Sequence, residues 1–580
     1  MLILKRFFFL LILFFVNFLL NHISFATPPS ANQQMSGQER ARQMEEESEK
    51  LQNQIEQPRS KIKPEEKTTQ QLPSETPAEQ KVLIKSIEVS GVTLFKESQI
   101  KAITAKYESK ELTLGEMQKI ADQITDMYRS KGYVISRAYV PAQKIENGIL
   151  EIMVIESRIG DIQLKGNRFY STRLIESYLT IKKGEFFNYN DLKCDLNNIN
   201  DHPDRVVRSV LIPGNQPGTT DIVLNERDSL PIHVQVGYND YLSRYLRTNL
   251  YSSTFIDNNL LGQDDILTFD YERGDNHNYY SYTTNYLYPV TKGLDLGIYA
   301  SRSKEVMAGE FAAVGAQGKS NMYGLYGSQN LIKNDGLSSK FNFGFDYVDV
   351  FNFLEGSVSS QDRLRIVKSG LDFDIGDDFG RTLISDDFNY GIPDFMDGTK
   401  EDLNSTDIPT SRAGAGGEFV KDTLNILRLQ QLPFNSTLLW RNQLQFSSST
   451  LTSTEQFQIG GPANNRGYPV ADAVGDEGYS MSWELAQPPY FIPRSWVMPY
   501  SNTSIYDDVR VIEFYDWSNV HSNSVQPGEQ KDLTLSSAGC GLRLNILRNL
   551  SATYQVGWPL MGRSSDGKGV QNWFETTVTF

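Results

Sequence analysis

Residues 539–558, GCGLRLNILRNLSATYQVGW, carry the pattern that decides the fold. Two apolar faces can be read in this stretch: Cys540, Leu542, Leu544 and Ile546, and then Leu550, Ala552, Tyr554, Val556 and Trp558. Small or polar residues fill the positions between them. Because successive side chains of a β-strand point to opposite faces, each segment has one apolar and one polar face. The stretch therefore predicts two neighbouring strands of a meander with an apolar environment on one side.

Similar segments of about ten residues recur between polar turns from Pro231 to the C-terminus. Residues 437–446 alternate imperfectly, and Phe341, Phe343, Phe345 and Tyr347 form another apolar face. One apolar and one polar face on many strands is typical of a transmembrane β-barrel with a lipid-facing exterior and a polar lumen. At roughly 22 residues per strand and connection, the region predicts about 16 antiparallel strands. Phe574, Thr576, Val578 and Phe580 predict a closing strand that ends at Phe580.

A soluble β-sandwich or solenoid would also contain alternating strands. The density of Tyr and Phe disfavours it, because these residues suit the interfacial girdles of a membrane barrel. The N-terminus points the same way: Lys5 and Arg6 precede an apolar run from Phe7 to Leu20, and small residues follow at Ser24-Phe25-Ala26. That run is shorter than the roughly 20 residues that a transmembrane helix needs. Residues 1–26 are therefore expected to be a secretory signal peptide.

The composition disfavours several classes of function. The 56 basic and 71 acidic residues give a formal net charge of −15, which argues against a nucleic-acid partner. The five histidines lack metal-ligand spacing, and two cysteines, Cys194 and Cys540, cannot build a disulfide scaffold. Residues 562–568 imitate a phosphate loop, but Gly569 stands where Ser or Thr should hold magnesium. We therefore expect neither an enzyme nor a cofactor.

Two polar segments follow the predicted signal peptide. The segment 27–57, above all residues 30–57, is helix-prone and almost free of Gly and Pro. A segment that is polar all round cannot bury itself in a core, so it is either disordered or a helix seated in a polar cavity. Residues 58–80 contain Pro58, Pro64, Pro73 and Pro77 among polar residues, which predicts a flexible linker.

An internal repeat lies between this linker and the barrel. Ile84-x-x-Ile87-x-Val89-x-Gly91 recurs as Ile159-x-x-Ile162-x-Leu164-x-Gly166. Each copy predicts a small β-α-α-β-β domain, over 81–157 and 158–229, which leaves 230–580 for the barrel. A capping box at Thr113 to Glu116 starts a helix whose apolar stripe, Met117 to Tyr128, is expected to be core. The other predicted helices cover 96–107, 172–180 and 189–200, and the strands 82–91, 135–140, 149–155, 205–212 and 220–225.

This order of parts resembles the two-partner secretion transporters, the haemolysin and filamentous-haemagglutinin secretion/activation family. Its members have a plug helix, a linker, two POTRA (polypeptide-transport-associated) domains and a β-barrel. The most specific stretch, His202-Pro203-Asp204-Arg205-Val206-Val207 with Pro213-Gly214 and Pro217-Gly218-Thr219-Thr220-Asp221, is similar to the second POTRA signature. Gly132-Tyr133, Arg137-Ala138, Pro141 and Gln143 match the first, although ordinary turns also use such residues. The resemblance implies substrate binding by Pro203, Arg205, Val206, Pro213, Gly214, Pro217 and Gly218.

A second resemblance lies in the barrel. Gly460-Gly461 and Arg466-Gly467-Tyr468 resemble the family's long sixth loop, which folds inward, and Phe514-x-Asp516-x-Ser518 resembles the strand that receives its tip. An ion pair between Arg466 and Asp516 in the lumen is implied, because a guanidinium shielded from water needs a carboxylate. A solvated external loop is the alternative. Asn465 replaces the family's usual aliphatic residue and Ser518 its glycine, which changes the packing expected around the loop.

The resemblance implies an outer-membrane, porin-like pore of two-partner (type V) secretion. The POTRA pair in the periplasm would capture a large β-helical partner of adhesin or haemolysin type by adding an extended segment to a strand edge. The partner would cross the lumen unfolded, and the helix in 27–57 would plug the resting pore. Outer-membrane lipid and the barrel-assembly machinery are the other implied partners. An assembly factor that inserts other barrels is the alternative, although such factors usually carry more POTRA domains; a passive porin would need none.

Overall fold

The computed structural model describes residue 55 and residues 81–580, except 335, 401–406, 499–502, 526–528 and 547–548. The predicted signal peptide, the linker and the plug segment apart from Ile55 lie outside the described residues. Within these limits, no helix has the length and hydrophobicity needed to cross a membrane. The described chain forms two compact units. One holds Ile55, Ile232–Leu260 and Asp265–Phe580, and the other holds residues 81–231 with Leu261–Asp264.

The second unit begins with a domain that keeps the predicted β-α-α-β-β order but splits its first strand and adds a short strand, β3, between the helices. Its elements are β1 (Val82–Ile84), β2 (Ser86–Ser90), α3 (Glu97–Thr104), β3 (Lys110–Leu112), α4 (Leu114–Ser130), β4 (Arg137–Tyr139) and β5 (Ile149–Ile155). The capping box is present: the amide of Glu116 donates to the Thr113 hydroxyl at 3.3 Å, and the Glu116 carboxylate accepts from the amide of Thr113 at 2.8 Å. The predicted strand 82–91 breaks at Lys85, because β1 pairs with β3 while β2 pairs with β5.

The repeat produces a second domain with the same topology. It contains β6 (Arg158–Lys165), α5 (Thr172–Ser177), α6 (Tyr189–Asn200), β7 (Arg205–Pro213) and β8 (Thr219–Asp228). The sheet order β6-β8-β7 matches the order β2-β5-β4 of the first domain. In both sheets the last strand of the repeat, β5 or β8, lies in the middle. It runs parallel to the first strand, β2 or β6, on one side and antiparallel to β4 or β7 on the other, so β4 and β7 are edge strands. Each domain has its own apolar core, as the repeat predicts.

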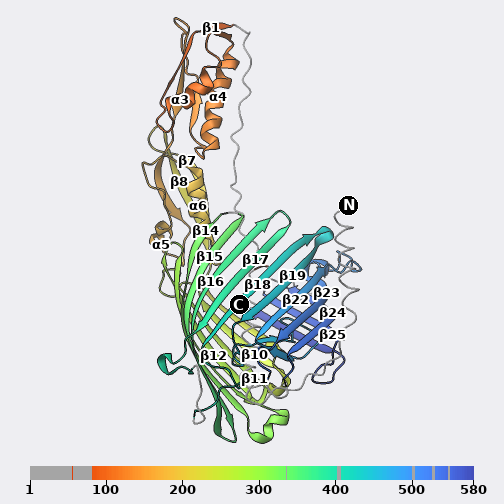
Figure 1. Cartoon of the computed structure of the whole chain (residues 1–580). Helices are drawn as coiled ribbons and strands as arrows, with labels where there is room; N and C mark the ends of the chain where they lie inside the picture. The colour runs from red at the N-terminus through yellow and green to blue at the C-terminus, as the bar shows by residue number, and fades with distance from the viewer. Residues whose placement is uncertain are drawn as a thin grey trace. The chain divides into compact units, whose positions relative to one another are not determined.

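Sixteen antiparallel strands form the closed barrel, which confirms the predicted count (Figure 1). They are β9 (Ile232–Asn239), β10 (Leu250–Asp257), β11 (Ile266–Gly274), β12 (Tyr279–Thr291), β13 (Leu294–Val306), β14 (Gln317–Lys333), β15 (Leu337–Leu354), β16 (Ser357–Asp377), β17 (Gly380–Gly391), β18 (Phe419–Leu432), β19 (Ser436–Ser447), β22 (Glu477–Gln487), β23 (Val509–His521), β24 (Asp532–Ile546), β25 (Leu550–Met561) and β26 (Gln571–Thr579). Short helical turns interrupt the connections: η1 (Arg244–Leu246), η2 (Asp275–His277), η3 (Gly309–Val314), η4 (Phe395–Asp397), η5 (Pro433–Asn435) and α7 (Ile505–Asp508).

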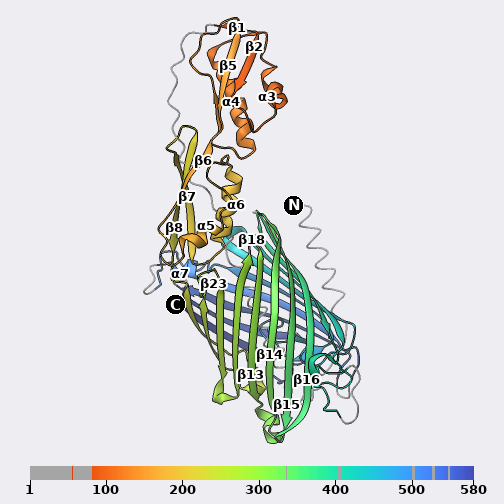
Figure 2. The ribbon, with the colours of Figure 1, turned by 90° about the vertical axis from the view of Figure 1, so that its left-hand side faces the viewer.

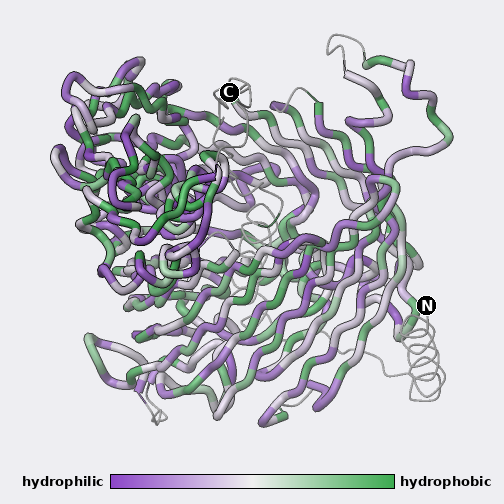
Figure 3. Tube along the Cα trace, turned by 90° about the horizontal axis from the view of Figure 1, so that it is seen from above, coloured by the Kyte–Doolittle hydropathy of each residue, from purple (hydrophilic) through white to green (hydrophobic). Residues whose placement is uncertain are grey.

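The barrel wall shows the two-residue alternation that the sequence predicts. Seen from above, hydrophobic and hydrophilic residues alternate along the strands (Figure 3). On β14, Tyr323 and Leu325 are exposed on the outside, and the neighbouring strand β15 exposes Phe341 and Phe343 on the same side. These long strands, β13 to β16, lie side by side in one wall (Figure 2). The outward apolar row is the surface that a lipid-facing barrel requires.

Closure joins the last strand to the first. β26 pairs with β9, and the register begins at Glu575 opposite Asn239. Beyond β26, the amide of Phe580 donates to the carbonyl of Val234 at 2.8 Å. Phe580 therefore lies at the seam, with its ring 72% exposed.

The connections differ between the two ends of the barrel. At the end where β9 begins, most strands are joined by short turns, with the exception of residues 488–508. The opposite end carries L5 (residues 392–418), L6 (448–476) and L7 (522–531). L6 contains a small hairpin of β20 (Phe457–Ile459) and β21 (Ala473–Gly475).

Candidate functional site

L6 folds back into the barrel instead of extending away from it. Gly460 and Gly461 have φ of 107° and 95°, a region that favours glycine, and a Cβ on Gly460 would lie 2.2 Å from the carbonyl oxygen of Pro469. The chain can therefore double back closely at this point. At the tip, a Cβ on Gly467 would lie 2.4 Å from the Cβ of Ser537 on β24. These two close backbone contacts, at Gly460 and at Gly467, explain why the loop motif has glycine on both sides of Arg466.

The structure brings Arg466 and Asp516 together. Nε and Nη2 of Arg466 donate to the two carboxylate oxygens of Asp516 at 2.9 and 2.8 Å, which is the bidentate geometry of a strong ion pair. Nη1 donates to Glu484 at 2.6 Å, and the guanidinium lies 3.5 Å from the centre of the Phe514 ring. The side chains of Arg466 and Asp516 are about 1% and 0% exposed, so the solvated-loop alternative does not hold.

Three further charged residues surround this pair. Glu484 of β22 also accepts from Arg543 of β24 at 2.9 Å and lies 3.9 Å from Arg441 of β19. Three guanidiniums therefore meet two carboxylates, those of Glu484 and Asp516. The sequence signal for the added residues is weak: Arg441 and Arg543 occupy polar-face positions of alternating strands, but only the strand register shows that they converge.

The two residues that depart from the family pattern contact each other. The Asn465 side-chain amide donates to the Ser518 hydroxyl at 2.7 Å, and the Ser537 hydroxyl donates to the Asn465 side-chain oxygen at 2.7 Å. All three residues are fully buried. Tyr468 is also buried, and its hydroxyl donates to the carbonyl of Met561. A buried hydrogen-bonded cluster thus occupies the place where the family pattern has an aliphatic residue and a glycine.

The second POTRA signature divides into a buried and an exposed part. The Arg205 guanidinium is buried and donates to both carboxylate oxygens of Asp264 at 2.5 and 2.6 Å, within the same compact unit. Its charged group lies 4.9 Å from the ring centre of Tyr170. Arg205 therefore joins the domain to the segment Leu261–Asp264 of the same compact unit, and its side chain does not reach a surface. Gly214 is half-buried, whereas the exposed members of the signature are Pro203, Val206, Pro213, Pro217 and Gly218.

An exposed apolar row runs along β7. Val206, Val210 and Ile212 are 47%, 48% and 40% exposed, and Arg208 between them is exposed as well. Even-numbered residues of one strand share a face. In the described part of the chain, β7 pairs with β8 on one side and with no strand on the other. A free edge with alternating apolar side chains is suited to accept an extended segment.

Ile55 is the one described residue of the predicted plug segment. It is helical, 1% exposed and packed among Leu383, Leu427 and Leu439 of the barrel strands β17 to β19. Leu439 pairs with Glu484 in the sheet register, so the two share the face on which Glu484 contacts Arg466. Ile55 therefore lies against the inner wall of the barrel.

Comparisons with known proteins agree with this architecture. A family model for the ShlB-type POTRA domain matches residues 82–157, and one for the haemolysin secretion/activation protein ShlB/FhaC/HecB matches residues 218–544. The heme/hemopexin transporter protein HuxB of Haemophilus influenzae is 22% identical over 485 residues, which cover 82% of this chain and 83% of that protein. The outer membrane transporter CdiB of Dickeya dadantii is 21% identical, with 82% of each chain covered.

Solved structures show the same fold. CdiB from Escherichia coli superposes with a TM-score of 0.71 at 21% identity, covering 93% of this chain and 98% of CdiB. BamA from Haemophilus ducreyi lacking POTRA domains 1–3 superposes with a TM-score of 0.53 at 14% identity, covering 86% of this chain and all of that one. At such identities the likeness concerns the fold alone.

Proposed function

Because this chain belongs to the haemolysin secretion/activation protein ShlB/FhaC/HecB family, we propose that it captures its secreted partner as an added β-strand on β7 of the second POTRA domain. The protein is an outer-membrane transporter of two-partner secretion whose POTRA domains stand in the periplasm. The proposal concerns how its partner is recognised. The observation that carries it is the free edge of β7 with exposed Val206, Val210 and Ile212. Main-chain hydrogen bonds would give affinity, and the apolar row would select the partner.

The partner that fits this surface is a large β-helical protein of adhesin or haemolysin type. Its strands alternate apolar and polar side chains, so an unfolded segment can place apolar residues over Val206, Val210 and Ile212 while it pairs with β7. Exposed Arg208 lies in the same row, and exposed Arg227 lies opposite Val206 on β8. These two positive charges favour a segment with acidic residues beside its apolar ones.

Site-specific photocrosslinking tests this capture model. A photoreactive residue at position 210 should crosslink to the partner during secretion, and one at Arg173, exposed on α5 of the same domain, should not. Val206→Glu combined with Val210→Glu should reduce secretion while the barrel keeps its normal abundance and heat-modifiability. Equal crosslinking from both positions, or normal secretion by the double variant, would remove β7 as the capture edge. Deleting 158–228 should abolish secretion while leaving a heat-modifiable barrel.

Residues 27–57 are proposed to plug the resting pore. The support is Ile55, which packs against lumen-side leucines of β17 to β19. Deleting 27–57 should raise single-channel conductance in planar bilayers, and Ile55→Asp should raise it in part, because a carboxylate is costly among Leu383, Leu427 and Leu439. Unchanged conductance after the deletion would mean that the segment does not obstruct the lumen.

The ion pair of Arg466 with Asp516 is proposed to hold L6 inside the barrel at rest. A chain that crosses the lumen needs the space that L6 occupies, so the loop must move during transport. The buried contacts of Arg466 with Asp516 and Glu484 are the ones that such a movement must break.

A further inference from the structure

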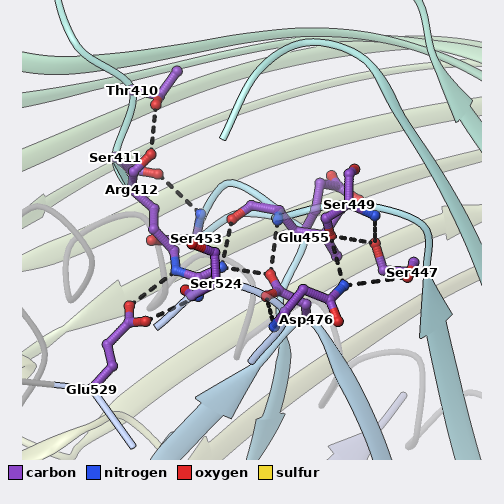
Figure 4. A network of polar contacts seen from close by, with 12 residues as sticks. Thr410, Ser411, Arg412, Ser447, Ser449, Ser453, Glu455, Asp476, Ser524 and Glu529 are labelled. Carbon is purple, nitrogen blue, oxygen red and sulfur yellow. Dashed lines mark hydrogen bonds and ion pairs between the residues drawn. The ribbon is translucent and has the colours of Figure 1, made fainter. Parts of the chain in front are cut away.

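A second polar network joins the loops at the surface end of the barrel (Figure 4). Its centre is Arg412 of L5, whose side chain is 0% exposed. Nη1 of Arg412 donates to Asp476, the last residue of L6, at 2.5 Å. Nε and Nη2 each donate to a carboxylate oxygen of Glu529 in L7 at 3.0 Å, and Nη2 also donates to the carbonyl of Ser524 at 2.9 Å. One guanidinium therefore contacts both L6 and L7.

The carboxylate of Asp476 extends the network to the other leg of L6. It accepts from the backbone amide of Leu451, at the start of L6, at 2.8 Å and from that of Asn523 in L7 at 2.8 Å. Asp476 is fully buried, and its two oxygens are shared among L5, L6 and L7. Both legs of L6 are thus tied to the same carboxylate.

Ser411 makes a further connection between L5 and L6. Its hydroxyl donates to Asp362 of β16 at 2.6 Å and accepts from the amide of Ser453 at 3.0 Å. Leu451 packs with Leu364 and Ile366 of β16, so the first residues of L6 also pack against the barrel wall. L5 therefore contacts both this wall and L6.

This network is separate from the contacts at the tip of L6. The tip contacts involve Arg466, Asp516 and Glu484, whereas the loop network involves Arg412, Asp476 and Glu529. Removing one member of a buried charged network leaves its partners uncompensated, so each contact depends on the others. L6 is therefore held at two places, at its tip and at its two legs.

We propose that Arg412 is a positioning residue of transport, the centre of a rim latch that joins L5, L6 and L7. The rim latch is the set Arg412, Asp476, Glu529 and Ser411 with their loop contacts. L6 can leave the lumen as a body only if both legs separate from L5 and L7. The rim latch must therefore open, together with the tip contacts, before the partner can pass.

A reversible disulfide tests whether the latch must open. Ser411→Cys and Ser453→Cys place thiols on two residues that already touch, because the Ser411 hydroxyl accepts from the backbone amide of Ser453 at 3.0 Å. The two backbones are therefore close enough for a disulfide. Cys194 and Cys540 are exposed and are first replaced by serine. The oxidised double-cysteine transporter should secrete at least tenfold less than its own reduced form, whereas secretion by each single cysteine variant should not depend on reductant. Equal secretion by the oxidised and reduced forms would overturn the proposal.

Conductance gives an independent readout. It is measured with residues 27–57 deleted, so that the proposed plug cannot mask the result. Arg412→Met should raise conductance or the frequency of open substates at least twofold, and Arg412→Lys should do so less. Arg428→Met is the matched control, because it breaks an ion pair with Asp377 at the opposite end of the barrel. If Arg412→Met fails to fold, Glu529→Gln is compared in its place. Unchanged conductance in a folded latch variant would overturn the proposal.

Discussion

Asn465 and Ser518 should behave as one unit when L6 is perturbed. Ser518→Gly leaves the Asn465 amide without its acceptor in a fully buried site, and Asn465→Leu leaves the hydroxyl groups of Ser518 and Ser537 without a partner amide. A buried polar group that loses its partner costs about 1–3 kcal/mol. Glycine inside a strand adds about 0.5–1 kcal/mol for Ser518→Gly.

The double change should cost much less than the sum of the two. Asn465→Leu with Ser518→Gly restores an aliphatic residue and a glycine, and replacing both partners of a hydrogen bond by apolar groups can be nearly neutral. The singles therefore sum to about 2.5–7 kcal/mol, whereas the double should cost about 1 kcal/mol. The difference, a coupling free energy of one to several kcal/mol between the two substitutions, lies in or above the range of about 0.5–3 kcal/mol that is usual for residues in contact.

Single-channel recording measures this coupling, because each 1.4 kcal/mol changes the population of the released loop about tenfold. Asn465→Leu, at about 1–3 kcal/mol, should show open substates about 5 to 140 times as often as the unaltered protein, and Ser518→Gly more often still. The double variant, at about 1 kcal/mol, should stay within about fivefold of the unaltered protein. Ser301→Gly is the control for glycine in a lumen strand, since Ser301 is bonded to Thr283 of the neighbouring strand at 2.8 Å. A double variant as leaky as the two singles combined would refute the reasoning.

Three further predictions concern other parts of the chain. Arg466→Ala and Asp516→Ala should each cut secretion strongly, because breaking a buried pair costs about 3–5 kcal/mol. In a double-mutant cycle that measures exported partner, the loss of the double variant should be far below the sum of the two single losses. Additive losses would mean that the two residues act separately. Burial, with repulsion from Asp228, raises the pKa of Glu226 to about 7. The folded domain then binds more protons than the unfolded chain, so the stability of β8 should fall as pH rises from about 4.5 to 7. Hydrogen exchange of the full chain measures this dependence, and Glu226→Gln should flatten it. Thr113→Ala should destabilise the first turn of α4 by about 1 kcal/mol, seen as faster exchange of its amides, and unchanged exchange would contradict the role of the capping box.

The sequence predicts the architecture well because its signals are local. Alternation over about ten residues identifies a strand without knowledge of its neighbours, and a repeated Ile-x-x-Ile motif identifies two copies of a small β-α-α-β-β domain, which the resemblance then named as POTRA domains. Arg466 and Asp516 came from the resemblance. Glu484 could not be found in the same way, because its contact with Arg466 depends on the register that places β22 beside β23.

The same limit applies to the loops. Arg412 lies in a long connection with no periodic pattern, and its partners Asp476 and Glu529 come from two other loops. Nothing in the order of residues indicates that these three charges meet. Lys85 shows a different case at a strand. The prediction takes 82–91 as one strand, but Ile84 and Ile87 are three residues apart, so the two-residue alternation changes phase across Lys85. The strand breaks there because β1 pairs with β3 and β2 pairs with β5.

L6 is held by charged contacts at its tip, around Arg466, and at its legs, around Arg412. This choice of contact affects how L6 can be released. Apolar packing of similar volume can hold a loop at least as firmly as a buried ion pair, but its strength changes little when a few water molecules arrive. The attraction between two charges about 4 Å apart is about 4 kcal/mol at an effective dielectric constant of about 20 and about 1 kcal/mol in water. An extended polypeptide that enters the lumen brings polar backbone and water to Arg466 and Arg412. On the proposed mechanism, the contacts that hold L6 at rest would therefore weaken when the partner arrives, and L6 could be released without a separate source of energy at the loop itself.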